Sequence, residues 1–291
     1  MTRVFENLRR KWQWLAAQAG FQRAPALIIF RLTAWGIHCI IGRGAVVRLG
    51  RWNVSIYLPP RWRGIEKLIF AFREGYEREL AYLENALSPG QTFIDVGANL
   101  GIYTLVASKI VGPSGRVIAF EPSSQSFSLL KSNITLNGFT NVQAYPTAVS
   151  DKIGKAFLYN GPDPAQNSLG RHLRLEPKGE EVVTQPLDSA LSQAPVERVH
   201  VIKIDVEGAE ELVLRGADNV VTAHHPVIIF EINHEASTRL GLLPLGARDL
   251  LNRLGYRFGS IRANAVHETT SLPTLGNVIA IYAPLERRSL L

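Results

Sequence analysis

The residues best suited to chemistry in this chain are acidic residues that end short apolar runs. The four that matter most are Asp95, Glu121, Asp205 and Glu231. Short apolar runs bounded by turn residues predict buried strands. In an open α/β sheet the carboxyl ends of the strands line one crevice, where ligands bind. We therefore expect the four carboxylates to surround a single ligand site.

The segment from Asp95 to Gly101 indicates which ligand that site holds. It reads Asp-Val-Gly-Ala-Asn-Leu-Gly and connects a predicted strand to a predicted helix at 102–108. Glycines let the backbone turn sharply and let a ligand approach closely. The G-x-x-x-G spacing differs from the G-x-G-x-x-G of dinucleotide sites, and the Asp95 carboxylate would repel a pyrophosphate. A cationic amino group suits it better, which favours S-adenosylmethionine over NAD; an ordinary strand-to-helix turn is the alternative.

The next strand end strengthens the interpretation as a cofactor site. Glu121 closes the predicted strand 116–120, where a carboxylate can accept hydrogen bonds from both hydroxyls of a ribose. We expect Asp95 and Gly97 to face the methionine part of the cofactor and Val149-Ser150 to flank its adenine. The full set of predicted cofactor-binding residues is Asp95, Gly97, Ala98, Asn99, Gly101, Glu121, Pro122, Val149 and Ser150.

Alternating strands and helices position these residues. The predicted strands are 93–96, 116–120, 142–145, 200–204, 226–232, 256–260 and 277–282, with a hairpin pair at 155–160 and 181–185. Helical segments lie between most of them, and this alternation implies a mainly parallel sheet covered on both faces. The expected fold class is therefore α/β and Rossmann-like, with helices on both faces of the sheet and a helical extension before it.

Three motifs resemble the FkbM-type methyltransferases. They are Phe-Ile-Asp-Val-Gly-Ala-Asn-Leu-Gly at 93–101, Ala-Phe-Glu-Pro-Ser at 119–123 and Ile-Lys-Ile-Asp-Val-Glu-Gly-Ala-Glu at 202–210; Asn167-Ser168-Leu169 and Ile229-Phe230-Glu231-Ile232 fit the same pattern. The resemblance covers about residues 75–283, and the motif at 202–210 is the most specific. It implies the seven-stranded sheet of class I methyltransferases, S-adenosylmethionine as methyl donor and, usually, methylation of a hydroxyl oxygen.

The motif at 202–210 supplies the predicted catalytic residues. Lys203 and Asp205 share one strand face because side chains alternate along a strand. Glu207 and Glu210 are three residues apart and can share a helix face. Methyl transfer to a hydroxyl needs an aligned acceptor and a base. Asp205 is the expected base or acceptor orienter, tuned by Lys203, with Glu207 and Glu231 beside it; an ion pair that caps the helix is the alternative.

No metal ion is expected in the site, although one arrangement stays open. Asp205, Glu231 and His234 offer two hard oxygens and an imidazole, a set that can hold a divalent cation. The single cysteine, Cys39, excludes an internal disulfide and a cysteine-rich zinc site. We expect Cys39 to be a small buried apolar residue in a protein of a reducing compartment.

The first part of the chain differs from the rest in charge. Residues 1–63 carry eleven Lys or Arg, one acid (Glu6) and all five tryptophans, whereas the remainder carries 21 basic and 24 acidic residues. Residues 1–19 predict a basic amphipathic helix. The apolar run 24–41 contains Arg31, which costs roughly 3 kcal/mol on insertion scales, so we expect no membrane span and no cleaved signal peptide. A helix lying on an anionic membrane suits this composition; packing on the catalytic domain is the alternative.

The expected organisation is a basic, Trp-rich extension of helices and a short hairpin over 1–87, followed by a methyltransferase domain over 88–285. The acceptor is expected to be a small molecule, a sugar or a lipid-linked glycan. An NAD-dependent oxidoreductase and a non-catalytic, membrane-peripheral binding module are the alternatives. We expect a cytoplasmic protein, with peripheral contact to the inner membrane face as an option. Nucleic acid is not an expected partner, because no recognisable binding motif accompanies the arginines.

Overall fold

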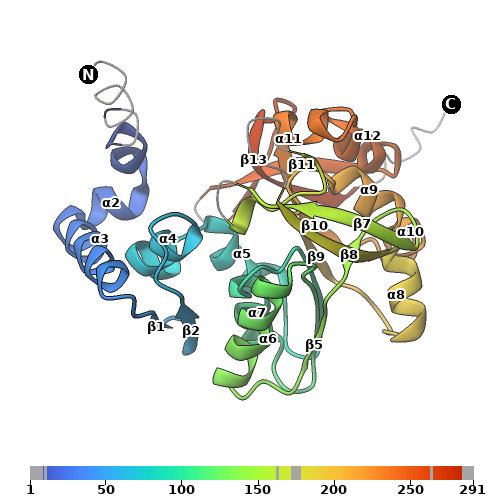
Figure 1. Cartoon of the computed structure of the whole chain (residues 1–291). Helices are drawn as coiled ribbons and strands as arrows, with labels where there is room; N and C mark the ends of the chain where they lie inside the picture. The colour runs from blue at the N-terminus through green and yellow to red at the C-terminus, as the bar shows by residue number, and fades with distance from the viewer. Residues whose placement is uncertain (1–8, 10–11, 162–163, 172–177, 263–264, 284–291) are drawn as a thin grey trace, which may run out of the picture. The chain divides into compact units, whose positions relative to one another are not determined.

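The computed structural model describes residues 9, 12–161, 164–171, 178–262 and 265–283 (Figure 1). The chain divides into two compact units, Met1–Glu77 and Arg78–Leu291. Helix α5 (Arg78–Ala86) belongs to the second unit, with Leu80 and Leu83 fully buried. The division therefore falls before α5, whereas the sequence predicts a domain boundary after it, at residue 87; the predicted domain end at 285 lies outside the described residues.

The first unit is built from short helices and a hairpin. Its elements are α2 (Ala19–Arg23), α3 (Pro25–Ile40), β1 (Ala45–Leu49), β2 (Val54–Leu58), α4 (Ile65–Phe72) and the short helix η1 (Arg73–Gly75). The hairpin β1–β2 is the short hairpin that the sequence predicts within residues 1–87. Of the helix predicted over 1–19, residues 9 and 12–17 are helical, while 1–8, 10 and 11 lie outside the described part. No helix among the described residues is long and apolar enough to cross a bilayer.

The second unit is organised on an eight-stranded sheet of order β12-β11-β13-β10-β9-β3-β4-β5. The strands are β3 (Thr92–Val96), β4 (Arg116–Phe120), β5 (Val142–Tyr145), β9 (Val201–Ile204), β10 (Val227–Asn233), β11 (Tyr256–Arg262), β12 (Ala265–Glu268) and β13 (Leu275–Tyr282). Strands β5, β4, β3, β9 and β10 pair in parallel, and β13 is antiparallel to both of its neighbours. The predicted Rossmann-like fold is confirmed, and β12 extends the seven expected strands at one edge.

Helices cover both faces of this sheet. The remaining helices are α6 (Ile102–Val111), α7 (Ser124–Leu136), α8 (Leu187–Gln193), α9 (Glu210–Arg215), α10 (Asp218–His224), α11 (His234–Arg239) and α12 (Gly246–Arg253). Ile94 and Ile202 share a buried cluster with Leu251 of α12, whereas Ala119 packs with Leu130 of α7. Because side chains alternate along each strand, these clusters lie on opposite faces. The near-continuous apolar strands are those of a sheet buried on both sides.

A second, three-stranded sheet of order β6-β8-β7 follows β5 in the chain. It consists of β6 (Ala148–Val149), β7 (Gly154–Tyr159) and β8 (Gly179–Gln185), with the short helix η2 (Pro164–Gln166) between β7 and β8. Strands β7 and β8 pair antiparallel, as the sequence predicts for 155–160 and 181–185. This small sheet places Val149, Leu158 and the segment 165–169 beside the carboxyl ends of the main strands.

Candidate active site

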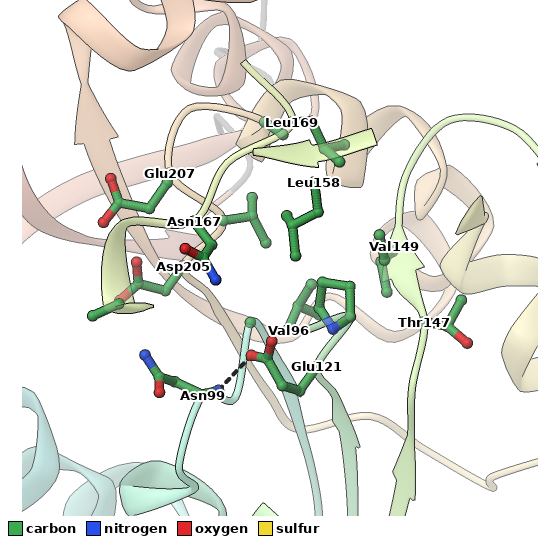
Figure 2. Close-up of a pocket in the computed structure, with 16 residues that line it drawn as sticks. Val96, Asn99, Glu121, Thr147, Val149, Leu158, Asn167, Leu169, Asp205 and Glu207 are labelled. Carbon is green, nitrogen blue, oxygen red and sulfur yellow. Dashed lines mark hydrogen bonds between the residues drawn. The ribbon is translucent and has the colours of Figure 1, made fainter. Parts of the chain in front are cut away.

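A pocket of about 580 Å³, partly open to solvent, lies at the carboxyl ends of β3, β4 and β9 (Figure 2). The small sheet and the segment after η2 complete its wall. Of the predicted cofactor residues, those that line it are Gly97, Asn99, Glu121, Pro122 and Val149; of the predicted catalytic residues, Asp205 and Glu207 do so. The chain thus brings residues from widely separated strand ends to one pocket, where ligands of open α/β sheets bind.

The turn after β3 depends on left-handed backbone at Gly97, Asn99 and Gly101, whose φ angles are +83°, +51° and +97°. A Cβ atom at Gly97 would lie 1.9 Å from the carbonyl oxygen of Asp205. The glycine therefore allows the turn to pack directly on the end of β9. This packing brings the backbone of Asn99 to the pocket and sets it opposite Glu121.

Glu121 presents a buried carboxylate to the pocket. Glu121 is only 7% exposed. Its two carboxylate oxygens accept hydrogen bonds from the backbone N–H groups of Asn99, at 2.7 Å, and Ser123, at 2.8 Å. Burial raises the pKa of Glu121 to about 7, although both backbone hydrogen bonds act in the opposite direction. Since each carboxylate oxygen has a second acceptor direction, Glu121 can accept hydrogen bonds from two neighbouring hydroxyls.

Four predicted cofactor residues lie outside the pocket lining. The Asp95 carboxylate is buried and accepts the Thr104 hydroxyl at 2.6 Å, and burial raises its pKa to about 6. Ala98 packs with Leu130, and Gly101 precedes α6 as its N-cap. Ser150 is buried, and its N–H donates to the backbone of β8. These residues shape the turns around the pocket.

An ion pair holds Asp205 at the pocket edge. Lys203 is only 1% exposed, and its Nζ donates to Asp205 Oδ2 at 3.0 Å and to Asn277 Oδ1 at 3.1 Å. The same ammonium lies 5.3 Å from the centre of the Tyr103 ring. Asn277 and Tyr103 come from β13 and α6, so no spacing within the 202–210 motif points to them. The pair fixes one oxygen of Asp205 while the residue itself lines the pocket.

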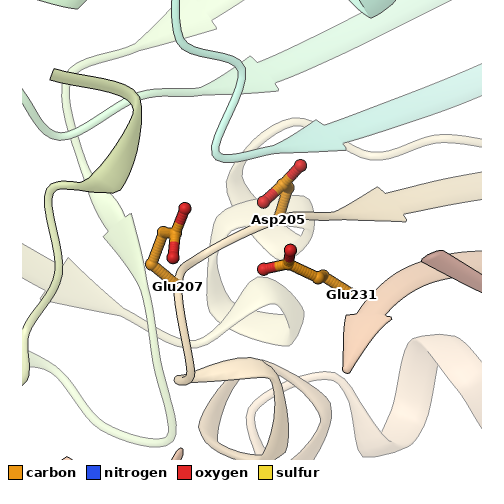
Figure 3. Close-up of side chains that lie close together, drawn as sticks. All are labelled: Asp205, Glu207 and Glu231. Atoms are coloured by element: carbon orange, nitrogen blue, oxygen red, sulfur yellow. The ribbon is translucent and has the colours of Figure 1, made fainter. Parts of the chain in front are cut away.

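Asp205, Glu207 and Glu231 form a carboxylate cluster, with one oxygen of each within 4.8 Å of the others (Figure 3). In the structure, the residue that lies with Asp205 and Glu231 is therefore Glu207. His234, the third member of the predicted alternative metal set, is not part of this group among the described residues. Burial, followed by the charges of Asp205, Glu207 and Glu210, raises the pKa of Glu231 far above its usual range. Burial and the neighbouring carboxylates thus favour the protonated form of Glu231.

A neighbouring segment fixes the position of Glu207. This residue adopts a left-handed φ of +51°, which is unfavourable for glutamate. The buried Ser168 hydroxyl donates to the Glu207 carbonyl at 2.7 Å, and Asn233 Nδ2 lies 3.4 Å from its Oε2. Asn167, beside Ser168, lines the pocket. The sequence singles out 167–169 only through the family resemblance, because a short polar loop carries no chemical signal of its own.

The chemistry of the lining residues fits S-adenosylmethionine. Among the described lining residues the charged ones are all acidic: Glu121, Asp205 and Glu207. An apolar wall stands beside them, formed by Pro122, Val149, Leu158 and Leu169. Carboxylates complement a cationic ligand, and Glu121 suits a ribose diol. The apolar wall suits a flat ring system such as adenine. The sequence does not identify Leu158, Leu169 and the other apolar lining residues, because apolar residues are equally common in any protein core.

A model of the methyltransferase FkbM domain matches residues 95–258. Several curated relatives match part of the chain, including the following three. "Methyltransferase 1" of Beauveria bassiana is 30% identical over 151 residues, which cover 45% of this chain and 60% of that protein. "31-O-demethyl-FK506 methyltransferase FkbM" of Streptomyces tacrolimicus is 28% identical over 203 residues, covering 59% and 76%. "AMB antimetabolite synthetase AmbE" of Pseudomonas aeruginosa is 26% identical over 220 residues, covering 63% of this chain but only 10% of that protein.

The sheet order and the pocket at its strand ends define a Rossmann-like, class I methyltransferase domain, for which S-adenosylmethionine is the cofactor. The match covers more than half of the chain, which therefore belongs to the FkbM methyltransferase family. The family resemblance seen in the three motifs is confirmed, and an NAD-dependent oxidoreductase is no longer supported.

The buried acids predict how stability depends on pH in the cofactor-free protein. Burial raises the pKa of Asp95 to about 6 and of Glu121 and Glu210 to about 7. Between pH 4 and 7 the folded state therefore binds more protons than the unfolded state, so stability falls as pH rises. At about 1.4 kcal/mol per pKa unit, urea unfolding should give a free energy several kcal/mol larger near pH 5 than near pH 8. A free energy that rises over this interval would contradict these pKa shifts.

Proposed function

We propose that the protein transfers the methyl group of S-adenosylmethionine to a hydroxyl oxygen of a small molecule or glycan. The observation that carries the proposal is the Lys203–Asp205 pair, which holds a carboxylate at the edge of the cofactor pocket. Hydroxyl methylation requires a group that takes the hydroxyl proton as the oxygen reacts. We assign this role to Asp205, because it lines the pocket.

Each residue of the site has a defined task in this proposal. S-adenosylmethionine, when bound, supplies an electrophilic methyl group on a sulfonium centre. Glu121 accepts hydrogen bonds from the ribose hydroxyls and sets the orientation of the nucleoside. Asp205 accepts the proton of the acceptor hydroxyl, while Lys203 holds its other oxygen in place. Orienting the reacting groups in this way lowers the entropic part of the barrier.

The carboxylate cluster indicates what the reacting part of the acceptor is like. Glu207 accepts hydrogen bonds when ionised, and Glu231, when protonated, can also donate one. Together with Asp205 they suit a neutral group with several hydroxyls, because an anionic group would meet like charge. Lys203 already balances the charge of Asp205, which supports the expectation that the site works without a metal ion.

The name of one relative supports an oxygen acceptor. The Streptomyces tacrolimicus protein is named as a 31-O-demethyl-FK506 methyltransferase, and it matches this chain over 203 residues. The chain spans 60% of the Beauveria bassiana protein and a tenth of AmbE. The proposed acceptor therefore follows from the pocket residues of this chain and not from the substrates of its relatives.

The chemistry of the labelled product tests this proposal. The protein is incubated with methyl-labelled S-adenosylmethionine and a cell extract or membrane fraction, and the product is analysed by NMR and by mild alkaline hydrolysis. We expect the label in a methyl ether, which survives alkali. Label in an N-methyl group, or in a methyl ester released by alkali, would contradict a hydroxyl acceptor.

We also propose that the N-terminal unit holds the enzyme at the inner face of a membrane. The support is the charge of residues 1–63, in which eleven Lys or Arg accompany one acid. Clustered basic residues are attracted to anionic lipid headgroups. A lipid-linked glycan with a neutral hydroxyl at its reacting end would satisfy both this surface and the acidic pocket.

A further inference from the structure

Helix α3 is apolar on two opposite sides, although only one is covered within the first unit. Its inner side carries Ile28 and Trp35, which are buried. The Trp35 ring lies 5.1 Å from the Phe70 ring of α4, tilted by 42°, and its indole N–H donates to the Arg61 carbonyl at 2.8 Å. Arg31, also on this side, donates to the Ala71 carbonyl at 3.0 Å. The inner side therefore accounts for the packing of α3 against α4.

The outer side of α3 is a continuous apolar stripe. Phe30, Ile37 and Ile40 recur at helical spacing and are 69%, 55% and 75% exposed. Ile29 and Ile41 adjoin them and are exposed as well. The polar member of the stripe, Thr33, donates its hydroxyl to the Ile29 carbonyl at 3.0 Å, so its donor is satisfied within the helix. Such a stripe is costly in water and suits an apolar environment.

Basic and aromatic residues lie near the ends and the flank of α3. Exposed arginines precede and follow α3, at Arg23 and Arg43. The exposed Trp62 ring lies beside the helix, because a Cβ at Gly36 would be 3.7 Å from it. Tryptophan and arginine are the side chains that favour the boundary between headgroups and acyl chains. The hairpin adds a further exposed apolar pair, the facing residues Val46 and Tyr57.

We infer that the outer side of α3 inserts into the headgroup region of an anionic lipid bilayer, with the helix lying along the surface. Charge decides between the occupants of this stripe. Residues 1–63 carry eleven basic residues and one acid, so a second copy of the chain would bring like charges together, whereas anionic lipid complements them. The inference rests on the peripheral location proposed above and identifies the outer side of α3 as the surface that contacts the membrane. It is independent of the methyl transfer chemistry.

Vesicle sedimentation of the full-length protein tests the inference. We expect binding to vesicles of phosphatidylcholine mixed with phosphatidylglycerol, weaker binding to phosphatidylcholine alone, and a loss of binding with added salt, since salt screens exposed charges. The variant Phe30→Ser/Ile40→Ser should partition about tenfold less well, because it removes two apolar anchors. The matched control is Ile153→Ser in the second unit, since Ile153 is 74% exposed and Ile40 75%; it should bind as the wild type does.

Three results would overturn the inference: no vesicle binding, equal binding to both vesicle types, or equal binding by wild type and the Phe30→Ser/Ile40→Ser variant. A wild-type dimer that becomes a monomer in this variant, without vesicle binding, would assign the stripe to a second copy instead. Measuring S-adenosylmethionine affinity on the same preparations keeps the two proposals apart. That affinity should be unchanged in both variants, so failure of vesicle binding leaves the methyltransferase proposal standing.

Discussion

Replacing Asp205 by asparagine is expected to lower the rate of methyl transfer about 100- to 10,000-fold, the usual contribution of a general base, while S-adenosylmethionine still binds. The substitution keeps the shape of the side chain and removes its ability to take a proton. Cofactor affinity should change little, because Glu121 and the turn at Gly97 lie on other strands. The rate is measured as label transferred from methyl-labelled cofactor, and the affinity by equilibrium dialysis.

The same substitution leaves the buried ammonium of Lys203 without its carboxylate. Because the Asp205 side chain is 37% exposed, the expected cost is that of one lost partner, roughly 1–3 kcal/mol of stability. The double variant Lys203→Met/Asp205→Asn separates this effect from catalysis, because it removes both charges together. We expect the double variant to regain stability and to remain inactive. Recovery of the rate in the double variant would show that the pair is structural. Asp151→Asn is the matched control, since Asp151 is exposed and outside the pocket lining; its rate should equal that of the wild type.

Replacing Glu121 by glutamine is expected to weaken S-adenosylmethionine binding about 100-fold. Hydrogen bonds to a charged acceptor contribute roughly 1.5–3 kcal/mol each, and tenfold in affinity corresponds to about 1.4 kcal/mol. Both carboxylate oxygens already accept backbone N–H groups, from Asn99 and Ser123. The amide NH₂ of glutamine would face one of these donors, so the turn after β3 is disturbed as well. The dissociation constant is measured by equilibrium dialysis with labelled cofactor.

Glu180→Gln provides the control for Glu121→Gln. The Glu180 carboxylate also accepts a backbone N–H, that of Ser124 at 3.0 Å, yet the residue does not line the pocket. Its substitution should leave cofactor affinity within a factor of about two, a few tenths of a kcal/mol. If both variants bind the cofactor as tightly as the wild type does, the ribose role of Glu121 is wrong.

The parallel strands were predictable because a strand buried on both faces is apolar along its length. Residues 117–120 and 227–230 are such runs. The edge strand β12 escaped prediction because Ala-Val-His-Glu is short and mostly exposed. Helix α11 was not predicted because it follows β10 without an intervening turn. Its signal was Asn233, whose side chain accepts the Ala236 N–H and caps the helix.

The site could be predicted where it depends on strand ends and not where it depends on packing between distant segments. Glu121 and Asp205 follow strands, so the topology alone brings them to the pocket. Asp95 was expected to face the ligand, but in the sheet it is the register partner of Lys203 and points to the face covered by Thr104 of α6. Asn277 holds Lys203 from a strand more than seventy residues away. A contact between segments so far apart cannot be predicted from the sequence around either residue.

Calorimetric titration of the wild-type protein with S-adenosylmethionine tests the central claim, that the pocket at the ends of β3, β4 and β9 is the site of the methyl donor. The account predicts saturable binding with one cofactor per chain, competed by S-adenosylhomocysteine and strongly weakened by Glu121→Gln but not by Glu180→Gln. An absence of binding by the folded wild-type protein would contradict it.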